Sequence, residues 1–269
     1  MMDAPARLVL LGHPVAHSIS PRFQNAALQA AGIPLTYELI DVAPEGLDDM
    51  IAALAREHGA GNVTIPHKEQ FALRCARLMP LAQRVGAVNV FWHEQGQLVG
   101  DNSDVGGAEL TIRALLDGKL RDARVAVIGA GGGAAAVLCA LERCGVTEAR
   151  VYNRGMPRAL ALAARFSPFA RAVDSIADAL AGARLVVNTT PQGLHAGDDM
   201  PVPIDQLPPE CAVFDLAYAR GETAWVKAAR NGGHRAADGE GMLVEQGAIA
   251  FERWFGYEPD RNVMWKAMA

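Results

Sequence analysis

The feature that most constrains the fold is Arg124–Val137, where a β-branched apolar run ends in glycines and an alanine-rich segment follows. Val125–Ile128 predicts a buried strand, and the alanines after it predict a helix. Gly129, Gly131 and Ala134 have the G-x-G-x-x-G/A spacing, in which the first glycine makes the turn, the second admits a pyrophosphate, and the third position packs helix on strand. We interpret the stretch as the start of a dinucleotide-binding domain. A glycine-rich loop without a ligand is the alternative.

The rest of the chain alternates apolar runs with helical segments, which predicts an α/β protein with a mostly parallel sheet. In the first half we expect a strand over 8–11, a helix with Ser20 as its N-cap, and a helix over 69–79. From Val125 onward the pattern predicts six strands, the number in a complete Rossmann fold.

The fold class is therefore α/β with two domains, an N-terminal α/β substrate domain with a mostly parallel sheet and a Rossmann dinucleotide-binding domain. We place the domain crossover at Gly106-Gly107, which follow Asp104 and precede an expected helix over Ala108–Asp117. Residues 1–104 with 239–269 form the substrate domain, and residues 105–238 form the Rossmann domain. Asp104, in the loop before the next helix, would then lie near a hinge.

Polar side chains gather at the predicted strand ends of the first half. They are Ser18, Ser20, Asn62, Thr64, Lys68, Asn89, Asn102 and Asp104. Ligands of parallel α/β sheets bind outside the carboxyl ends of the strands, so we expect these groups to converge on one small polyhydroxylated molecule. The alternative for each is a local role, since Ser20 can act as a helix cap alone and Lys68 as a solvated charge.

Composition excludes several classes of protein. A net charge of −5 argues against a general nucleic-acid footprint, and no apolar run approaches the ~20 residues of a membrane span. The four cysteines form no C-x-x-C pair and the seven histidines show no ligand spacing, so we expect free thiols and no metal site. The first residues lack a signal-peptide pattern. We expect a cytoplasmic protein with no nucleic-acid or membrane partner.

The end of the second Rossmann strand indicates which dinucleotide binds. NAD-binding domains usually carry Asp or Glu there, on the ribose 2′-hydroxyl, whereas a nearby arginine suits a 2′-phosphate. This chain has Asn153 and Arg154, with Arg158 further on and no acid, and guanidinium matches phosphate geometry. The sequence therefore favours NADP, with NAD as the alternative if both arginines are surface charges at a helix start.

Several further motifs occur in order along nearly the whole chain. They are Gly12-x-Pro14-x-x-His17-Ser18-x-Ser20-Pro21, Gly61-Asn-Val-Thr-x-Pro-x-Lys68, Ala87-Val-Asn89, Gly100-x-Asn-Ser-Asp104-x-x-Gly107, Gly129-Ala-Gly131-Gly, Asn153-Arg154 and Gly241-Met-Leu-x-x-Gln246. Together they resemble the shikimate dehydrogenase family. The resemblance implies an NAD(P)-dependent oxidoreductase of aromatic amino-acid biosynthesis, which interconverts shikimate and 3-dehydroshikimate by hydride transfer.

The resemblance also implies roles for individual residues. Lys68 and Asp104 are the expected catalytic pair, and the sequence leaves open which of the two holds the proton at neutral pH. The expected substrate-binding residues are Ser18, Ser20, Thr64, Asn89, Tyr218 and Gln246. The expected cofactor-binding residues are Gly129, Gly131, Gly132, Gly133, Ala134, Asn153, Arg154, Arg158, Thr189, Thr190, Pro191, Leu216, Gly239 and Met242.

Two alternatives to this function remain open, the first of them because the chain departs from the family pattern. Gly155 stands where threonine is common, which removes a hydroxyl from the expected phosphate site, and Tyr218 precedes Ala219-Arg220 instead of Asn-Pro. One alternative is an NAD-preferring quinate/shikimate dehydrogenase-like paralogue. The other is a non-catalytic nucleotide-binding regulatory protein. For the enzymes we expect a small-molecule substrate, a shikimate-like hydroxy acid, and a monomer or homodimer.

Overall fold

The chain divides into two compact units, each with its own sheet and core. The first consists of Met1–Asp104 with Leu243–Ala269, and the second of Val105–Met242. The computed structural model describes residues 4–117, 121–193, 197–219 and 221–268. Both sheets are mostly parallel, so the predicted α/β class is confirmed.

The first unit is built on a sheet with the order β2-β1-β3-β5-β6-β4, six-stranded over the described residues. Its strands are β1 (Arg7–Gly12), β2 (Tyr37–Asp41), β3 (Gly59–Val63), β4 (Arg77–Leu78), β5 (Val90–Glu94) and β6 (Gln97–Asp101). Its helices are α1 (Ser20–Ala30), η1 (Pro44–Gly46), α2 (Leu47–Arg56), α3 (Lys68–Ala72), α4 (Pro80–Val85) and α11 (Arg261–Lys266). The helix α10 (Gly239–Phe255) belongs to this unit from Leu243 onward.

Strand register brings distant parts of the first unit to one edge of its sheet. β1 and β3 are parallel, so their carboxyl ends lie at the same edge. β5 is antiparallel to β3 and β6, and Val90 at its start pairs with Asn62 on one side and Asp101 on the other. The residue before β5 therefore lies beside the residues that follow β3 and β6. This pairing brings Asn89 close to Ser103 and Asp104.

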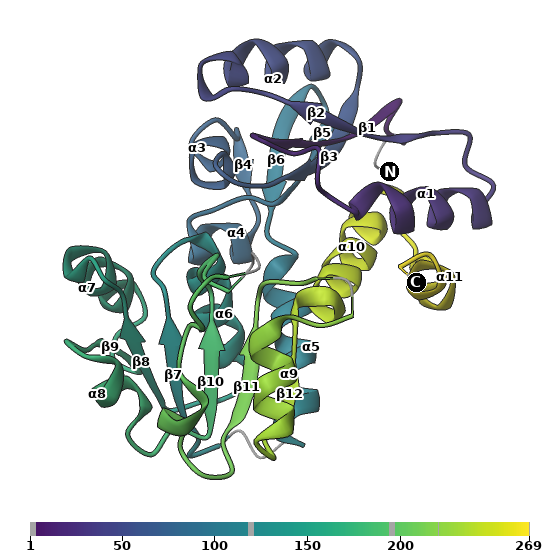
Figure 1. Ribbon diagram of the computed structural model, residues 1–269. Helices are drawn as coiled ribbons and strands as arrows, with labels where there is room; N and C mark the ends of the chain where they lie inside the picture. The colour runs from purple at the N-terminus through teal and green to yellow at the C-terminus, as the bar shows by residue number, and fades with distance from the viewer. Residues whose placement is uncertain (1–3, 118–120, 194–196, 220, 269) are drawn as a thin grey trace. The chain divides into compact units, whose positions relative to one another are not determined.

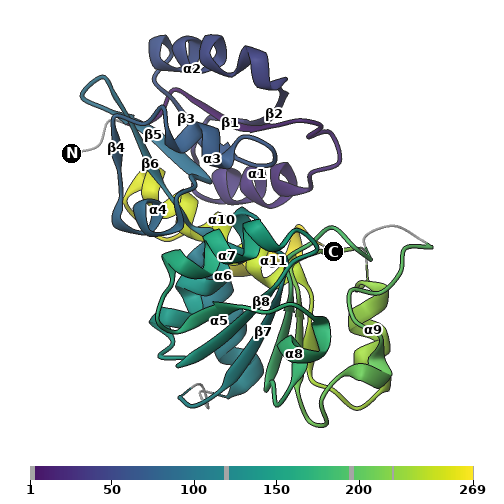
Figure 2. The same ribbon diagram turned by 90° about the vertical axis from the view of Figure 1, so that its left-hand side faces the viewer.

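The second unit is a doubly wound parallel sheet, shown in Figures 1 and 2 with α5 and α6 along one face and α8 and α9 along the other. Its strands are β7 (Arg124–Ile128), β8 (Glu148–Tyr152), β9 (Ala170–Ala172), β10 (Leu185–Asn188), β11 (Ala212–Asp215) and β12 (Ala236–Ala237). Its helices are α5 (Asp104–Leu116), α6 (Gly132–Arg143), α7 (Met156–Arg165), α8 (Ile176–Leu180), η2 (Ile204–Gln206) and α9 (Ala224–Asn231). The order β12-β11-β10-β7-β8-β9 across the described strands is the 3-2-1-4-5-6 order of a Rossmann fold, counted from β7.

One edge of the Rossmann sheet is covered by a charged side chain. β12 is the edge strand, and the carbonyl oxygen of its Ala236 accepts hydrogen bonds from Nε and Nη2 of Arg230, over 3.1 and 2.7 Å. Arg230 also pairs with Glu222. The guanidinium therefore lies directly on the backbone of the edge strand.

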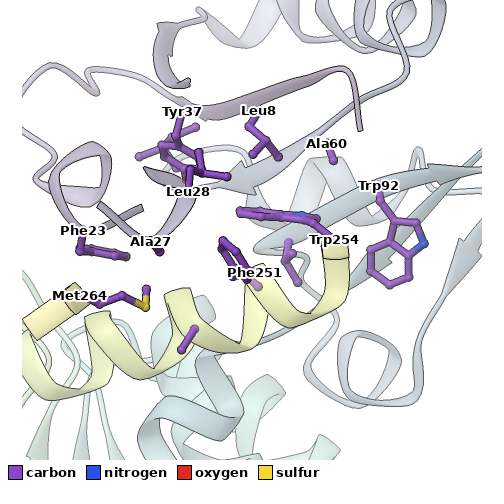
Figure 3. Close-up of a cluster of buried hydrophobic side chains, with 14 of the residues drawn as sticks. Leu8, Phe23, Ala27, Leu28, Tyr37, Ala60, Trp92, Phe251, Trp254 and Met264 are labelled. Carbon is purple, nitrogen blue, oxygen red and sulfur yellow. The ribbon is translucent and has the colours of Figure 1, made fainter. Parts of the chain in front are cut away.

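The core of the first unit fixes α10 against the sheet. Figure 3 shows Phe251 and Trp254 rising from α10 toward Leu8 and Tyr37, and the rings of Tyr37 and Trp254 have centroids 5.9 Å apart. Phe251 is fully buried, so we expect its truncation to alanine to cost about 3–5 kcal/mol of stability. The anchored helix carries Gln246 on its buried side.

The predicted helix over 69–79 is wrong beyond its first turn. α3 ends at Ala72, and Arg77–Leu78 forms β4, which pairs in parallel with β6. The backbone N–H of Ala76 donates to Leu98 O over 2.9 Å. A partner strand distant in sequence therefore overrides the local helical pattern. In the described part of the chain, no helix has both the length and the apolar character needed to cross a membrane.

Candidate active site

Lys68 and Asp104 form an ion pair in the first unit. Lys68 Nζ donates to Asp104 Oδ2 over 2.6 Å, and the two side chains are 21% and 9% exposed. Asp104 is the first residue of α5 rather than a loop residue as predicted, and the helix expected from Ala108 already includes Gly106 and Gly107. A carboxylate at a helix start is favoured by the helix dipole. The pair is shielded on most sides, yet water reaches its lysine, as proton exchange requires.

Asn89 holds Asp104 through the second carboxylate oxygen. Its Nδ2 lies 2.7 Å from Asp104 Oδ1, 3.0 Å from Ser103 Oγ and 3.2 Å from Gln246 Oε1. Its Oδ1 accepts the backbone N–H of Ser103 over 2.7 Å. Because Lys68 and Asn89 engage different oxygens of Asp104, the plane of the carboxylate is fixed.

Gln246 joins this cluster from α10. It is 8% exposed, and its Oε1 lies 3.2 Å from Asn89 Nδ2 and 3.3 Å from Ser103 Oγ. Its Nε2 donates to the carbonyl oxygen of Leu243 over 2.9 Å. Val244 in the same helix is fully buried in the core. The apolar face of α10 therefore determines where its glutamine lies.

Ser18 and Ser20 are hydrogen-bonded to each other in the loop after β1 and at the start of α1. Ser18 Oγ lies 3.2 Å from Ser20 Oγ and accepts the backbone N–H of Ser20 over 3.3 Å. The predicted capping role of Ser20 is wrong, because Ile19 occupies the cap position and no side-chain cap bond forms at this described helix start. The Ser20 hydroxyl is therefore not occupied by a capping bond.

Thr64 follows β3 at the same sheet edge as the loop after β1. Thr64 is half-buried, and a Cβ on Gly12 would lie only 2.5 Å from its methyl carbon. The backbone N–H of Thr64 donates to Leu11 O over 2.8 Å. The absence of a side chain at Gly12 thus allows Thr64 to pack against the end of β1.

Two residues support the cluster, of which Asn62 was expected among the strand-end polar groups and Tyr37 was not singled out. The Tyr37 hydroxyl donates to Asn62 Oδ1 over 2.6 Å, and Asn62 Nδ2 donates to the carbonyl oxygen of Asn89 over 2.9 Å. Burial raises the pKa of Tyr37 well above its usual value, so it remains a hydrogen-bond donor. The signal for Tyr37 was the asparagine inside β3, since a buried amide needs a hydrogen-bond partner.

In the second unit, the glycine turn between β7 and α6 has the geometry of an anion-binding site. Gly129 has φ +116°, and a Cβ there would collide with Thr189 Oγ1. A Cβ on Gly131 would meet no described atom within 4 Å. α6 begins at Gly132, and Gly131 at its cap position supplies no side-chain hydrogen bond in the described structure. Ala134 is fully buried. Free helix N–H groups beside open space fit a pyrophosphate.

Arg154 and Arg158 lie exposed after β8 and in α7. Neither pairs with an acid within the residues that the structure describes. Asn153 Nδ2 donates to the carbonyl oxygen of Gly155 over 3.0 Å. Gly155 occupies the cap position of α7, with φ −95° and without a capping side chain. Two unpaired guanidinium groups at a strand end fit a 2′-phosphate.

The loops after β10 and β11 are joined by two buried residues that the sequence analysis did not single out. Asn188 Oδ1 accepts from N and Oγ1 of Thr190 over 3.0 and 2.7 Å, and its Nδ2 donates to Asp215 Oδ1 over 2.9 Å. Asp215 also accepts from Ala217 N over 3.2 Å and Thr223 Oγ1 over 2.8 Å. Burial raises the pKa of Asp215, although the hydrogen bonds from Thr223 and Asn188 oppose that rise.

The other expected residues of the second unit lie at these strand ends or at the start of α10. Thr189 Oγ1 donates to Ile128 O over 2.9 Å. Tyr218 is half-buried, and burial raises its pKa. The backbone N–H of Gly239 donates to Ala217 O over 2.9 Å. The remaining positions are Gly133 in α6, Pro191 after β10, Leu216 after β11 and Met242 in α10.

Three family models match successive parts of the chain. The model described as "Shikimate dehydrogenase substrate binding domain" matches residues 10–91. The model described as "Shikimate / quinate 5-dehydrogenase" matches residues 111–220. The model described as "Shikimate 5'-dehydrogenase C-terminal domain" matches residues 239–269.

Individual proteins match over almost their whole length. A shikimate dehydrogenase (NADP(+)) of Rubrobacter xylanophilus is 41% identical, and the match covers 100% of this chain and 97% of that protein. The Thermus thermophilus shikimate 5-dehydrogenase in complex with NADP(H) and shikimate is 38% identical with a TM-score of 0.87, covering 97% and 98% of the two chains. A Corynebacterium glutamicum quinate dehydrogenase in complex with NAD is 29% identical with a TM-score of 0.89, covering 98% and 99%. The chain therefore belongs to the shikimate dehydrogenase family.

Proposed function

We propose that the protein is an NADP-dependent shikimate dehydrogenase that interconverts shikimate and 3-dehydroshikimate. The observation that carries this proposal is the Lys68–Asp104 pair, 2.6 Å long, in a chain of the shikimate dehydrogenase family. A protein that only sensed a nucleotide would have no need for such a proton-transfer pair. The pair is also braced by Asn89, as a catalytic geometry requires.

Lys68 moves the proton in this proposal. The nicotinamide cofactor supplies or accepts the hydride when it is bound. In reduction, an N–H bond of the Lys68 ammonium breaks and an O–H bond forms at the substrate's former carbonyl oxygen; in oxidation the neutral amine takes the hydroxyl proton. Asp104 holds Nζ through a charge-assisted hydrogen bond. The exposed part of the lysine lets water restore the proton.

We assign the binding of the substrate's carboxylate and of its remaining hydroxyl groups to side chains that carry hydroxyl or amide groups. Such groups suit a polyhydroxylated acid because hydroxyls donate and accept, while amides present both kinds of group. Ser18 and Ser20 support this assignment, since their hydroxyls lie 3.2 Å apart and the Ser20 hydroxyl makes no capping bond to α1. The proposed set is Ser18, Ser20, Thr64, Asn89 and Gln246, together with Tyr218 of the second unit.

The second unit is proposed to bind the dinucleotide, with NADP favoured. The open space at Gly131 and the uncapped start of α6 support a pyrophosphate site there. The unpaired Arg154 and Arg158 support a 2′-phosphate at the adenosine ribose. In this proposal residues 105–238 form the cofactor domain, and residues 1–104 with 239–269 form the substrate domain.

A second candidate is an NAD-linked quinate/shikimate dehydrogenase. Gly155 favours it, because the cap of α7 offers no hydroxyl to a 2′-phosphate. The similarity to a quinate dehydrogenase in complex with NAD points in the same direction. Arg154 and Arg158 favour NADP. We give their two positive charges more weight than the absence of a hydroxyl group at Gly155.

The test is a two-by-two assay of the purified protein. Shikimate or quinate is mixed with NADP⁺ or NAD⁺, and absorbance of the reduced nicotinamide is followed. We expect kcat/KM to be highest with shikimate and NADP⁺. A higher value with quinate and NAD⁺ would select the second candidate. No turnover of either alcohol, with nucleotide binding retained, would select a regulatory protein.

We further infer a cytoplasmic protein that is a monomer or homodimer. The four cysteines are free thiols, which is typical of proteins in a reducing compartment. Light scattering at several protein concentrations would distinguish a monomer from a dimer. A fluorescent fusion found outside the cytoplasm would contradict the inferred location.

A further inference from the structure

The loops after β10 and β11 belong to the β10–β12 half of the Rossmann sheet. Arg154 and Arg158 lie in the other half. In this fold each half of the sheet takes one mononucleotide half of a dinucleotide. Arg154 and Arg158 follow β8, so the proposed adenosine half belongs to β7–β9. The nicotinamide half then belongs to β10–β12, and this inference rests on the proposed function.

A single carboxylate connects three segments in that half. Asp215 Oδ1 accepts from Asn188 Nδ2 at the end of β10 (2.9 Å) and from the backbone N–H of Ala217 after β11 (3.2 Å). Its Oδ2 accepts from Thr223 Oγ1 over 2.8 Å. Thr223 in turn caps α9 by accepting from Val226 N over 3.3 Å. Asp215 therefore joins the ends of two strands to the start of a helix.

Asn188 extends these bonds into the loop after β10. Its Oδ1 accepts both the backbone N–H and the hydroxyl of Thr190, and its Nδ2 also lies 3.3 Å from Thr190 O and 3.2 Å from Gln192 O. The path of the loop from Thr190 to Gln192 thus depends on one amide side chain. That amide is oriented in turn by Asp215, which accepts only from its NH₂ end.

Neither residue is placed to touch a ligand itself. Asn188 and Asp215 are both 0% exposed, and Asp215 pairs with no cation in the described portions of the chain. A buried carboxylate without a cation is costly unless its hydrogen bonds are complete. Here both oxygens of Asp215 are used on loop and helix ends, which indicates a role in shaping those loops.

We infer that Asp215 and Asn188 are positioning residues, which hold the loops after β10 and β11 in one arrangement for the nicotinamide half of the cofactor. They act through Thr190 and Ala217 and not by contact with the cofactor. Asp215→Asn places an NH₂ group where an acceptor is needed, and Asn188→Ala removes the bonds to the Thr190 loop.

The test compares two ligands that share the adenosine half. Binding of NADP⁺ and of adenosine 2′,5′-bisphosphate is measured by calorimetry for the wild type, Asp215→Asn and Asn188→Ala. We expect Kd for NADP⁺ to rise about tenfold in both variants. Kd for the bisphosphate should change by less than about twofold, because that ligand lacks the nicotinamide half.

A matched control separates positioning from general instability. Ser175 caps α8 in the same unit by accepting from Asp178 N over 3.0 Å, and Ser175→Ala should cost about 1 kcal/mol of stability. We expect it to lower Tm while leaving both Kd values unchanged. If Asn188→Ala does not fold, Asp215→Asn alone decides the test.

Three results would overturn the inference. Unchanged NADP⁺ binding in the variants would show that the loops do not depend on these residues. Parallel weakening of both ligands would show a structural effect on the whole unit. A wild-type protein that binds neither ligand would refute the proposed function itself and this inference with it.

Discussion

Asn89 and Asp104 are joined by a hydrogen bond of 2.7 Å from Nδ2 to Oδ1, on the opposite carboxylate oxygen from Lys68 Nζ. The same amide contacts Gln246. One buried asparagine therefore links Asp104, at the start of α5, to Gln246 on a helix more than half the chain away. The geometry of the Lys68–Asp104 ion pair consequently depends on a neutral side chain.

Substitution Asn89→Ala should impair the enzyme through this link. Asp104 Oδ1 loses a buried donor, so the carboxylate and Lys68 are less well oriented. We expect kcat/KM for shikimate to fall about a hundredfold, measured by steady-state kinetics. Asn25→Ala is the control, because Asn25 bonds the backbone of Tyr37 in the same unit and should affect stability more than kinetics. Equal kinetic losses in the two variants would contradict a specific role.

Substitution Lys68→Met should remove the proton donor while keeping most of the side-chain volume. We expect kcat to fall by about a hundredfold or more, with little change in KM for shikimate. The exposed Lys227 on α9 provides a control lysine, and Lys227→Met should retain near-normal kcat. A Lys68→Met variant with near-normal kcat would refute the assignment.

Substitution Gly155→Ser should strengthen the preference for NADP. The backbone there has φ −95°, and a Cβ would lie 3.4 Å from Asn153 Nδ2, an ordinary contact. The new hydroxyl can cap α7, which should raise the free energy of unfolding by roughly a few tenths of a kcal/mol. It can also donate to a 2′-phosphate. The ratio of kcat/KM for NADP⁺ over NAD⁺ should rise, whereas Arg154→Gln should lower it. A ratio that falls in Gly155→Ser would place the 2′-phosphate elsewhere.

Glu148 should make stability depend on pH in the acid range. Burial alone would raise the pKa of its carboxyl, but hydrogen bonds from Arg124 and Arg150 outweigh burial and lower it to about 2. Because the folded pKa lies below the unfolded value, its contribution is present above about pH 4.5. It is then lost progressively as the pH falls toward about 2.

We therefore expect Glu148→Gln to destabilise the protein at pH 7 and to matter less as the pH falls. Urea unfolding of both proteins at pH 7, 5 and 3.5 measures this difference. Glu258→Gln is the control, since Glu258 is 66% exposed in its pair with Arg261 and should contribute little. A difference that grows toward low pH would contradict the expected sign.

Local signals made much of the fold predictable. The strand, glycine turn and helix around Gly129 are visible in the sequence because each depends on neighbouring residues, and the structure has β7 and α6 there. β4 was missed because pairing with β6 stabilises it. Ser20 was assigned a cap from residue type alone, whereas the helix start depends on the backbone angles of Ile19.

The candidate site was predictable to the extent that its residues lie at strand ends. Lys68, Asn89 and Asp104 were expected to converge, and the register of β3, β5 and β6 brings them together. Asn188 and Asp215 were missed for a physical reason. A buried polar residue within an apolar strand shows its role through its partners, and those partners are set by tertiary structure.

The guanidinium of Arg230 on the backbone of β12 has a consequence for behaviour at high concentration. An uncovered strand at the side of a sheet is a template on which another polypeptide can add, and this is a route to aggregation. Here an incoming strand would have to displace two hydrogen bonds to Ala236 O and bury a positive charge. The arginine thus acts as a gatekeeper that keeps neighbouring molecules from joining their sheets at this side.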